Sequence, residues 1–321
     1  VHRSGGYLPF AATIQARLKI PVIAVGRIEP ERAEQVLRRG DADFIAMGRK
    51  LLADPQLPGK MQRGEEDQIR ACIYCYACVS RIFLNDHVRC AVNPATGFEY
   101  ETVVSPAEKP RKLLVVGGGP AGMEAARIAA QRGHQVRLAE QGRSLGGTAF
   151  FASVVYPENG RLVDYLKQQI AGSSVELDLG VTVDESYLDS FRPDAVIVAT
   201  GARRDAPNIP GVDQDNVFSG DEMRGLMTGH GAESARSKLA FWQRWALSLA
   251  GSLGITRNAA LLARLSHVWM PLGKQVCIVG GGLVGAELAE FLALRGRKVS
   301  LIEESGKFAV ELPLVRRWRL L

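Results

Sequence analysis

A short glycine-rich turn between an apolar strand and a helix occurs twice in this 321-residue chain, and no other feature restricts the fold as strongly. In the first copy the glycines and a later acid are Gly117, Gly119, Gly122 and Glu140. In the second copy they are Gly280, Gly282, Gly285 and Glu303. Each acid ends the next strand-like run, eighteen residues after the last glycine of its copy.

This order of elements is typical of a dinucleotide-binding unit. The first glycine makes the turn, the second lets a pyrophosphate approach the backbone, and the third lets the helix pack on the sheet. The helix N-terminus then stabilises the phosphates, and the acid accepts hydrogen bonds from ribose hydroxyls. One glycine fingerprint is weak support, but two complete copies at equal spacing predict two doubly wound α/β units of Rossmann type.

A third apolar run, residues 194–199, is predicted to be a buried strand that ends in Thr200-Gly201. The two units and this Ala-Thr-Gly turn resemble the disulfide-reductase-type flavoproteins that hold two dinucleotides. The resemblance implies FAD in the first unit and NADH or NADPH in the second. Leu145-Gly146-Gly147 is similar to an FAD contact of that family. In trimethylamine dehydrogenase the first site holds ADP, so ADP stays open as the alternative.

Four cysteines form the second strong pattern: three are spaced by two residues and a fourth follows an eleven-residue loop, at Cys72, Cys75, Cys78 and Cys90. A clustered run with one outlier is typical of a cubane 4Fe-4S cluster. Zinc is the alternative, although its four-cysteine sites usually use two separated Cys-x-x-Cys pairs. We therefore predict that these cysteines bind one 4Fe-4S cluster. The remaining cysteine, Cys277, lies in an apolar run and is predicted to be a small core residue.

Two strand-like runs in residues 1–70 each end in a Gly-Arg pair, with a helix-like segment between them, and the first run, residues 20–27, is predicted to be a fully buried strand. The pairs are Gly26-Arg27 and Gly48-Arg49. Glycine lets the backbone approach a ligand and arginine supplies a planar fork of donors, so each pair suits a phosphate. In eight-stranded barrels the loops after the last two strands are the usual phosphate site. A chance repeat in a basic chain is the alternative.

These pairs, followed by the run Leu-Leu-Ala-Asp-Pro at residues 51–55, resemble the FMN-phosphate end of the barrel in the old yellow enzyme superfamily. Its long members, such as 2,4-dienoyl-CoA reductase and trimethylamine dehydrogenase, carry a cubane cluster directly after the barrel. The resemblance implies FMN as a cofactor. It also implies that the first six strands, with the substrate and proton-donor residues, are absent from this chain. We therefore expect a fragment whose catalytic residues are unknown.

Composition excludes several other classes of protein. The net charge of +6 is spread along the chain, so nothing predicts a nucleic-acid partner. No apolar run is long enough to span a bilayer, and the first residues lack a signal peptide's apolar core. Cysteines in ligand spacing favour a reducing compartment, so we expect a cytoplasmic protein. A homo-oligomer and an electron-transfer protein as partner are both left open.

The expected division has five parts: the end of an FMN barrel (1–70), a cluster segment and linker (71–108), an incomplete FAD domain (109–220), a helical insert (221–273) and the start of an NAD(P) domain (274–321). In the insert, an apolar stripe that includes Trp242 and Trp245 is interpreted as core or domain contact rather than a membrane foot. No catalytic role is given to the histidines, His2, His87, His134, His230 and His267.

The favoured function is a three-cofactor oxidoreductase of small molecules, in which electrons from NADH reach FMN through FAD and the cluster. An activated C=C bond of enoate or enoyl-CoA type would be reduced there. NADH is favoured over NADPH because Glu303 and Glu304 would repel a 2′-phosphate. One alternative is an amine dehydrogenase that passes electrons to an electron-transfer protein. The other is a non-catalytic electron-transfer fragment.

Overall fold

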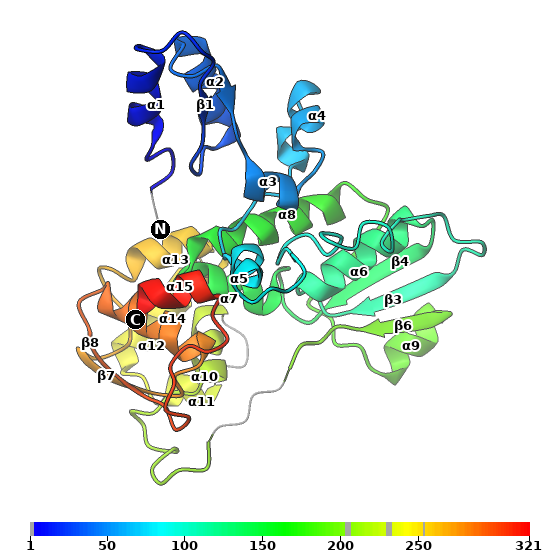
Figure 1. Cartoon of the computed structure of the whole chain (residues 1–321). Helices are drawn as coiled ribbons and strands as arrows, with labels where there is room; N and C mark the ends of the chain where they lie inside the picture. Colours follow the sequence, from blue (N-terminus) through cyan, green and yellow to red (C-terminus); the bar gives the residue numbers. More distant parts are fainter. Residues whose placement is uncertain (1–2, 203–206, 229–232, 253) are drawn as a thin grey trace. The chain divides into compact units, whose positions relative to one another are not determined.

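The computed structural model describes residues 3–202, 207–228, 233–252 and 254–321. The chain divides into two compact bodies, and both glycine units lie in the second body. The first holds residues up to 99 together with 313–319 and 321, and the second holds residues 100–312 and 320 (Figure 1). The division falls between the cysteine segment and the first glycine unit.

The first body contains a strand–helix–strand repeat, as predicted. Strand β1 (Ile23–Ala24) pairs in parallel with β2 (Phe44–Ile45), and α2 (Pro30–Arg39) connects them. Pro30 occupies the first turn of α2, where its missing N–H costs nothing, and Gly40 ends the helix with φ +70°. The other elements are α1 (Leu8–Gln15), α3 (Gly48–Ala53), α4 (Leu57–Gln62), η1 (Glu66–Gln68), α5 (Ala77–Phe83) and α15 (Leu314–Leu320).

Strand β1 is shorter and more exposed than a fully buried barrel strand. Ala24 is 2% exposed, whereas Ile23 is 62% exposed. Successive side chains of a strand point to opposite faces. One face of this two-stranded sheet packs on a buried cluster formed by Leu8, Ala24, Ile28, Ala33, Val36 and Ala42. The other face stays exposed, which is the physical reason why the prediction of complete burial was wrong.

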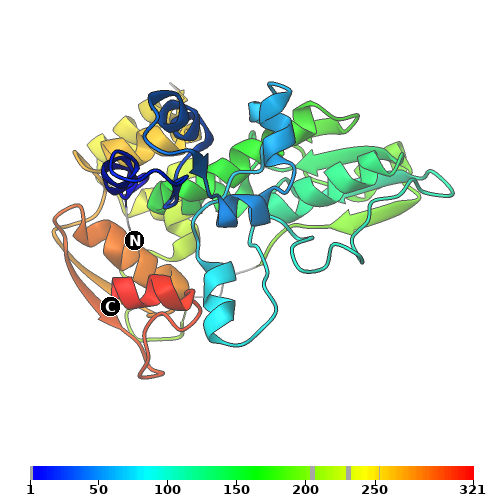
Figure 2. The same cartoon turned by 45° about the horizontal axis from the view of Figure 1, so that its top comes forward.

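The second body is built on a four-stranded parallel sheet in the order β5-β4-β3-β6, which confirms the predicted α/β class. Figure 2 shows this sheet in shades of green. Its strands are β3 (Lys112–Val116), β4 (Gln135–Glu140), β5 (Glu176–Leu179) and β6 (Ala195–Val198). The accompanying helices are α6 (Pro120–Gln131), α7 (Gly147–Val155), η2 (Pro157–Asn159), α8 (Gly160–Ala171) and α9 (Glu185–Phe191). Each connection runs between parallel strands through a helix, as in a doubly wound fold.

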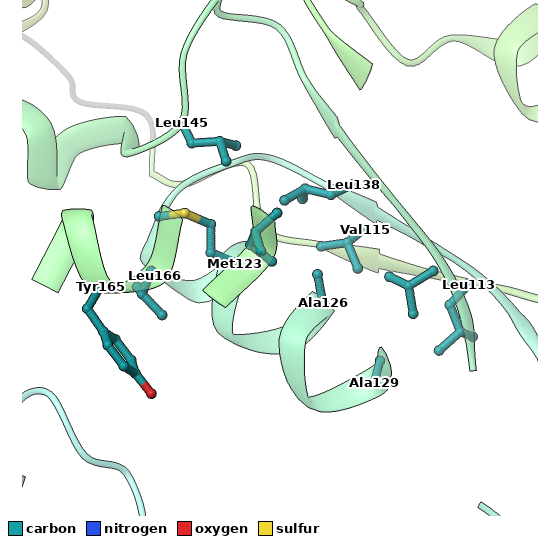
Figure 3. Close-up of a cluster of buried hydrophobic side chains, with 11 residues drawn as sticks. Leu113, Val115, Met123, Ala126, Ala129, Leu138, Leu145, Tyr165 and Leu166 are labelled. Carbon is teal, nitrogen blue, oxygen red and sulfur yellow. The ribbon is translucent and has the colours of Figure 1, made fainter. Parts of the chain in front are cut away.

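The core of the second body follows from the way in which successive side chains of β3 point to opposite faces of the sheet. Leu113 and Val115 pack on one face against α6 and α8, together with Met123 and Leu138, which are fully buried (Figure 3). Leu114 points to the other face, in a cluster with Phe191 of α9. Burial of one such side chain stabilises the fold by about 1.5–3 kcal/mol. Layers on both faces hold the end of β3, and with it the glycine turn, in place.

Strand β6 has the predicted position but only half of the predicted burial. It pairs with β3, yet Val198 is 73% exposed. The second parallel pair, β7 (Gln275–Val279) and β8 (Lys298–Ile302), behaves in the same way, because its side chains alternate between partly buried and exposed. Cys277 lies on the exposed face of β7, so its interpretation as a core residue was wrong. The alternating exposure of β6 and β7 shows that one face of each strand is left without a covering layer.

The predicted insert is helical: α10 (Gly220–Thr228), α11 (Glu233–Ser237), α12 (Phe241–Ser252), η3 (Ile255–Arg257) and α13 (Ala259–Leu265). Helix α13 packs with α7 and with α14 (Leu283–Ala293) in a shared cluster around Val154 and Leu292. Trp242 and Trp245 of α12 are 56% and 64% exposed, so within the described residues they are not core. None of the helices in the described ranges is long and apolar enough to cross a membrane.

Candidate functional site

The first glycine turn has the tight geometry that its spacing predicts. Gly117 has φ +109°, a conformation that side chains disfavour. A Cβ atom built on Gly122 would lie 1.9 Å from the carbonyl oxygen of Gly117, so α6 packs on the turn only because this position has no side chain. Among the described residues, nothing lies within 4 Å of the Cβ position of Gly119, at the start of α6. The turn therefore presents bare backbone where a pyrophosphate is expected.

Glu140 lies at the end of β4 and its carboxylate bends back onto the turn. Oε2 accepts a hydrogen bond from the Gly118 N–H at 2.6 Å, and Oε1 accepts one from the Gly142 N–H at 2.6 Å. These bonds fix the carboxylate beside the glycines, in the position where a ribose would meet it.

Two further predicted segments reach the same turn. The Gly146 N–H donates to the Gly118 carbonyl at 2.9 Å, and a Cβ atom on Gly147 would lie 3.0 Å from Cα of Gly119. On the other side, a Cβ atom on Gly117 would lie 3.1 Å from Cα of Thr200. Gly201 follows with φ +81°, a conformation that favours glycine. The structure thus gathers the first group of predicted residues around one turn.

The second turn repeats this geometry. Gly280 has φ +101°, and a Cβ atom on Gly285 would lie 1.8 Å from the Gly280 carbonyl oxygen. Glu303 accepts from the Gly281 N–H at 2.6 Å and from the Ser305 N–H at 3.0 Å. Hydrogen bonds from Ser305 and Gly281 lower the pKa of Glu303, so its carboxylate is ionised at neutral pH. Gly282 differs from Gly119, because the Glu311 carboxylate lies beside it.

The four predicted cysteines line one small cavity that is partly open to solvent. Its wall consists of Arg49, Cys72, Ile73, Cys75, Tyr76, Cys78, Cys90, Ala91 and Val92. No group of three or more His, Cys, Asp or Glu side chains among the described residues is arranged to hold a metal ion. The four cysteines share one cavity wall, and the cluster stays a prediction.

Backbone N–H groups point at the cysteine sulfurs. The Tyr74 N–H donates to Sγ of Cys72 at 3.4 Å, and the Ala77 N–H donates to Cys75. Burial raises the pKa of Cys75 to about 11, and burial also raises the pKa values of Cys72 and Cys78. Thiols with such pKa values are protonated at neutral pH. Iron would lower these pKa values, and the N–H groups would stabilise the resulting thiolates.

Both predicted arginines stack on tyrosines that alternate with the cysteines. The Arg27 guanidinium lies 3.8 Å from the ring centroid of Tyr74, and the Arg49 guanidinium lies 4.6 Å from that of Tyr76. Both tyrosines have positive φ values, +52° and +66°. Burial acts to lower the pKa of Arg49, but the hydrogen bond to Tyr76 and the nearby cysteines raise it on balance. Nη1 of Arg49 is buried without a hydrogen-bond partner among the described residues.

A buried polar triad anchors this segment. The Tyr74 hydroxyl donates to Oε1 of Glu29 at 2.6 Å and accepts from the Lys50 ammonium, which also pairs with Glu29 at 3.3 Å. The Lys50 side chain is only 8% exposed. Sequence analysis missed Tyr74, Tyr76, Lys50 and Glu29. The alternation of tyrosines with cysteines is the one signal that could have drawn attention to the first two.

The structure gives no site role to a further arginine beside the cysteines or to the described histidines. Arg70 donates to the Val92 carbonyl at 3.1 Å, so it holds the cysteine loop rather than standing free. His134 accepts from the Arg111 N–H at 3.1 Å, which is a structural contact. His2 and His230 lie outside the described residues.

The chain was compared with known proteins. The family model "Pyridine nucleotide-disulphide oxidoreductase" matches residues 111–314, and "NADH:flavin oxidoreductase / NADH oxidase family" matches residues 6–68. The NADH oxidase of Thermoanaerobacter brockii is 36% identical over 318 residues, which cover 97% of this chain and 43% of the relative. The chain therefore spans less than half the length of this relative.

Two solved structures resemble the whole chain. A complex of 2-naphthoyl-CoA reductase with 2-naphthoyl-CoA has a TM-score of 0.80 at 27% identity, covering 99% of this chain and 43% of that one. Histamine dehydrogenase from Rhizobium sp. 4-9 has a TM-score of 0.72 at 27% identity, covering 94% and 41%. The chain belongs to the pyridine nucleotide-disulphide oxidoreductase family over residues 111–314, and its residues 6–68 form a segment of the NADH:flavin oxidoreductase / NADH oxidase family.

Proposed function

We propose that this chain is the electron-carrying part of an iron–sulfur flavoprotein, in which electrons from NADH reach FMN through FAD and a 4Fe-4S cluster. The reaction served would be the reduction of an activated C=C bond of enoate or enoyl-CoA type. The observation that carries the proposal is the cavity lined by four cysteines, in a chain that also holds two dinucleotide turns. The two family models support the flavin and nicotinamide cofactors.

The cysteine loop would hold the cluster by four thiolates from Cys72, Cys75, Cys78 and Cys90. Arg49 lies in the same wall and brings a positive charge to a site that the thiolates make negative. N–H groups directed at the sulfurs spread that charge further. Residues of this chain would thus bind the cluster and favour its reduced form.

The glycine turns would hold two nucleotides. In the first unit, the turn from Gly117 to Gly122 would bind the FAD pyrophosphate and Glu140 the adenosine ribose. In the second unit, the turn from Gly280 to Gly285 and Glu303 would do the same for NADH. Arg27 and Arg49 would bind the FMN phosphate from the strand ends. When bound, the flavins exchange electrons in pairs or singly and the cluster exchanges them singly, which connects a hydride donor to a two-electron reduction.

A second candidate function is supported by the likeness to histamine dehydrogenase. In that case an amine would be oxidised at FMN, and electrons would leave through the cluster to an electron-transfer protein. The nucleotide in the first unit would then serve structure alone. The direction of electron flow separates the two, because only the reductase needs NADH to reduce the cluster.

The test is anaerobic reconstitution of the chain with ferrous iron and sulfide, followed by iron and acid-labile sulfide analysis. We expect about four of each per chain. Single Ser substitutions at Cys72, Cys75, Cys78 or Cys90 should lower both, whereas Cys277→Ser, a cysteine outside the cavity, should not. Stoichiometric zinc without labile sulfide would refute the cluster.

With FAD supplied, added NADH should then produce the electron paramagnetic resonance signal of the reduced cluster. A cluster that dithionite reduces but NADH does not would favour the amine dehydrogenase.

A further inference from the structure

The segment that follows β8 folds over the second glycine turn. The Ala309 N–H donates to the Gly281 carbonyl at 2.7 Å, and the Phe308 ring lies where a side chain on Gly281 would be, 2.5 Å from its Cβ position. Two residues later, the Glu311 carboxylate accepts a hydrogen bond from the Leu283 N–H at 2.9 Å. We call residues 308–311 the overlying segment.

Glu311 thus occupies the position that a dinucleotide pyrophosphate takes. Leu283 is the first residue of α14, so its N–H has no partner within the helix. Both Glu311 oxygens also lie 3.1 Å from the Cβ position of Gly282, the glycine that lets a pyrophosphate approach. A carboxylate at this place receives the same N–H groups and the same helix dipole that would stabilise a phosphate.

The first unit contains the same overlying segment without the acid. The two copies are offset by 163 residues, so Leu145 corresponds to Phe308 and Gly146 to Ala309. Leu145 covers Gly118 at 2.5 Å from its Cβ position, and the Gly146 N–H donates to the Gly118 carbonyl at 2.9 Å. The counterpart of Glu311 is therefore Thr148.

The counterpart glycines differ in what surrounds them. In the part of the chain that the structure describes, nothing lies within 4 Å of the Cβ position of Gly119. The two glutamates expected to bind ribose are arranged alike in both units. Glu140 and Glu303 each accept a hydrogen bond at 2.6 Å from the N–H of the glycine in the middle of the turn. The exchange of Thr148 for Glu311 is therefore what sets the second pyrophosphate position apart from the first.

The backbone of the second overlying segment is anchored on both sides of Glu311. Ala309 and Leu312 are buried against Ala286, whereas Val310 and Glu311 between them are exposed. The Glu311 carboxylate is thus held at the helix by its hydrogen bond and not by packing around it. Rotation of this side chain into solvent would leave Ala309 and Leu312 in place.

We propose that Glu311 is a specificity-determining residue of the second unit, where its carboxylate competes with the pyrophosphate of a nicotinamide dinucleotide for the N-terminus of α14. The inference rests on the proposed function, since it takes the second unit to be the NADH site. A dinucleotide binds there only when Glu311 leaves, because two anions cannot share one N–H and repel each other at that distance. The first unit binds its nucleotide without this competition.

The experiment exchanges the residues between the copies. NADH affinity is measured by fluorescence titration of the chain with FAD supplied, for the unmodified chain and for Glu311→Thr and Glu311→Gln. The Kd for NADH should fall about tenfold or more in both variants. The control is Glu108→Gln, which removes the same charge from an exposed position of the linker, away from both glycine turns in sequence, and should leave Kd within about twofold. In the reciprocal variant, Thr148→Glu, the affinity for FAD should fall.

Adenosine, which lacks the pyrophosphate, is the second probe. Its affinity should be the same with and without Glu311, because adenosine does not reach the N-terminus of α14. An equal gain for adenosine and NADH would show that Glu311 acts through the general shape of the site, and would overturn the inference.

Unchanged NADH affinity in both Glu311 variants would also overturn the inference, while NADH binding that depends on Glu303 would leave the proposed function standing. If none of the chains binds NADH, the inference and the NADH step of the proposed function both fail. Far-ultraviolet circular dichroism of every variant checks that it is folded.

Discussion

Removal of the Tyr74 hydroxyl is the sharpest test of how the cysteine segment is held. The substitution Tyr74→Phe keeps the ring under Arg27 but deletes two hydrogen bonds, one from the Lys50 ammonium and one to Glu29 at 2.6 Å. A hydrogen bond to a charged group contributes about 1.5–3 kcal/mol. Lys50 and Glu29 stay paired at 3.3 Å, so neither charge is left alone. We therefore expect the loss of roughly one such bond, about 2 kcal/mol.

The measurement is the free energy of unfolding of the first body, which contains residues 1–99. It is obtained from a urea titration in which hydrogen–deuterium exchange is followed in peptides within residues 44–84. The control is Tyr100→Phe, since Tyr100 is 80% exposed and its hydroxyl bonds the exposed Glu101. The control should change stability by less than about 0.5 kcal/mol. If Tyr74→Phe changes it equally little, the triad does not hold the segment and the reasoning is refuted.

Three other substitutions test the nucleotide turns and the cysteine cavity. Gly122→Ala would place a Cβ atom 1.9 Å from the Gly117 carbonyl oxygen, so it should lower the free energy of unfolding by about 1–3 kcal/mol or more and abolish FAD retention. Gly160→Ala, which makes only an ordinary contact at 3.6 Å, should be tolerated, and equal melting temperatures of the two variants would contradict this. Glu303→Ala should weaken NADH binding by about 1.5–3 kcal/mol and improve NADPH relative to NADH, and an unchanged ratio would make Glu303 a mere strand end. Arg49→Leu should lower the midpoint potential of the reconstituted cluster by roughly tens of millivolts, because it removes one positive charge from the wall that the four cysteines share. Arg49→Lys should restore most of the potential. Identical potentials in a titration monitored by electron paramagnetic resonance would show that the charge does not act on the cluster.

Sequence analysis predicted the parts of the fold that local patterns determine. The spacing of Gly117 and Gly122 requires a turn on which a helix can pack, and the structure has that turn. The burial of β1 and β6 was predicted too high, because a run of apolar residues does not reveal whether a second layer covers its outer face. That depends on neighbours far away in sequence, which no local pattern contains.

Part of the candidate site was hidden for a related reason. Lys50, Tyr74 and Glu29 come from three separate segments, and only the fold brings them together. Glu311 was within reach of the sequence alone, since the offset of 163 residues that relates the two glycine turns also relates Thr148 to Glu311. A comparison of the two copies that continues eight residues beyond Glu140 and Glu303 shows a hydroxyl in the first copy where the second has a carboxylate.

The left-handed backbone of Tyr74 and Tyr76 has a consequence for how two cofactors would depend on each other. Each such residue costs of order 1–3 kcal/mol and persists only where its surroundings enforce it. The contacts around these tyrosines include, besides the triad of Tyr74, the guanidinium groups of Arg27 and Arg49, the same side chains that would bind a flavin phosphate. Binding of a cluster to the loop would thus prearrange the arginines, and a phosphate on the arginines would stiffen the loop. By thermodynamic reciprocity each ligand would then strengthen the other by the same factor, so that iron starvation would loosen a flavin that no iron atom touches.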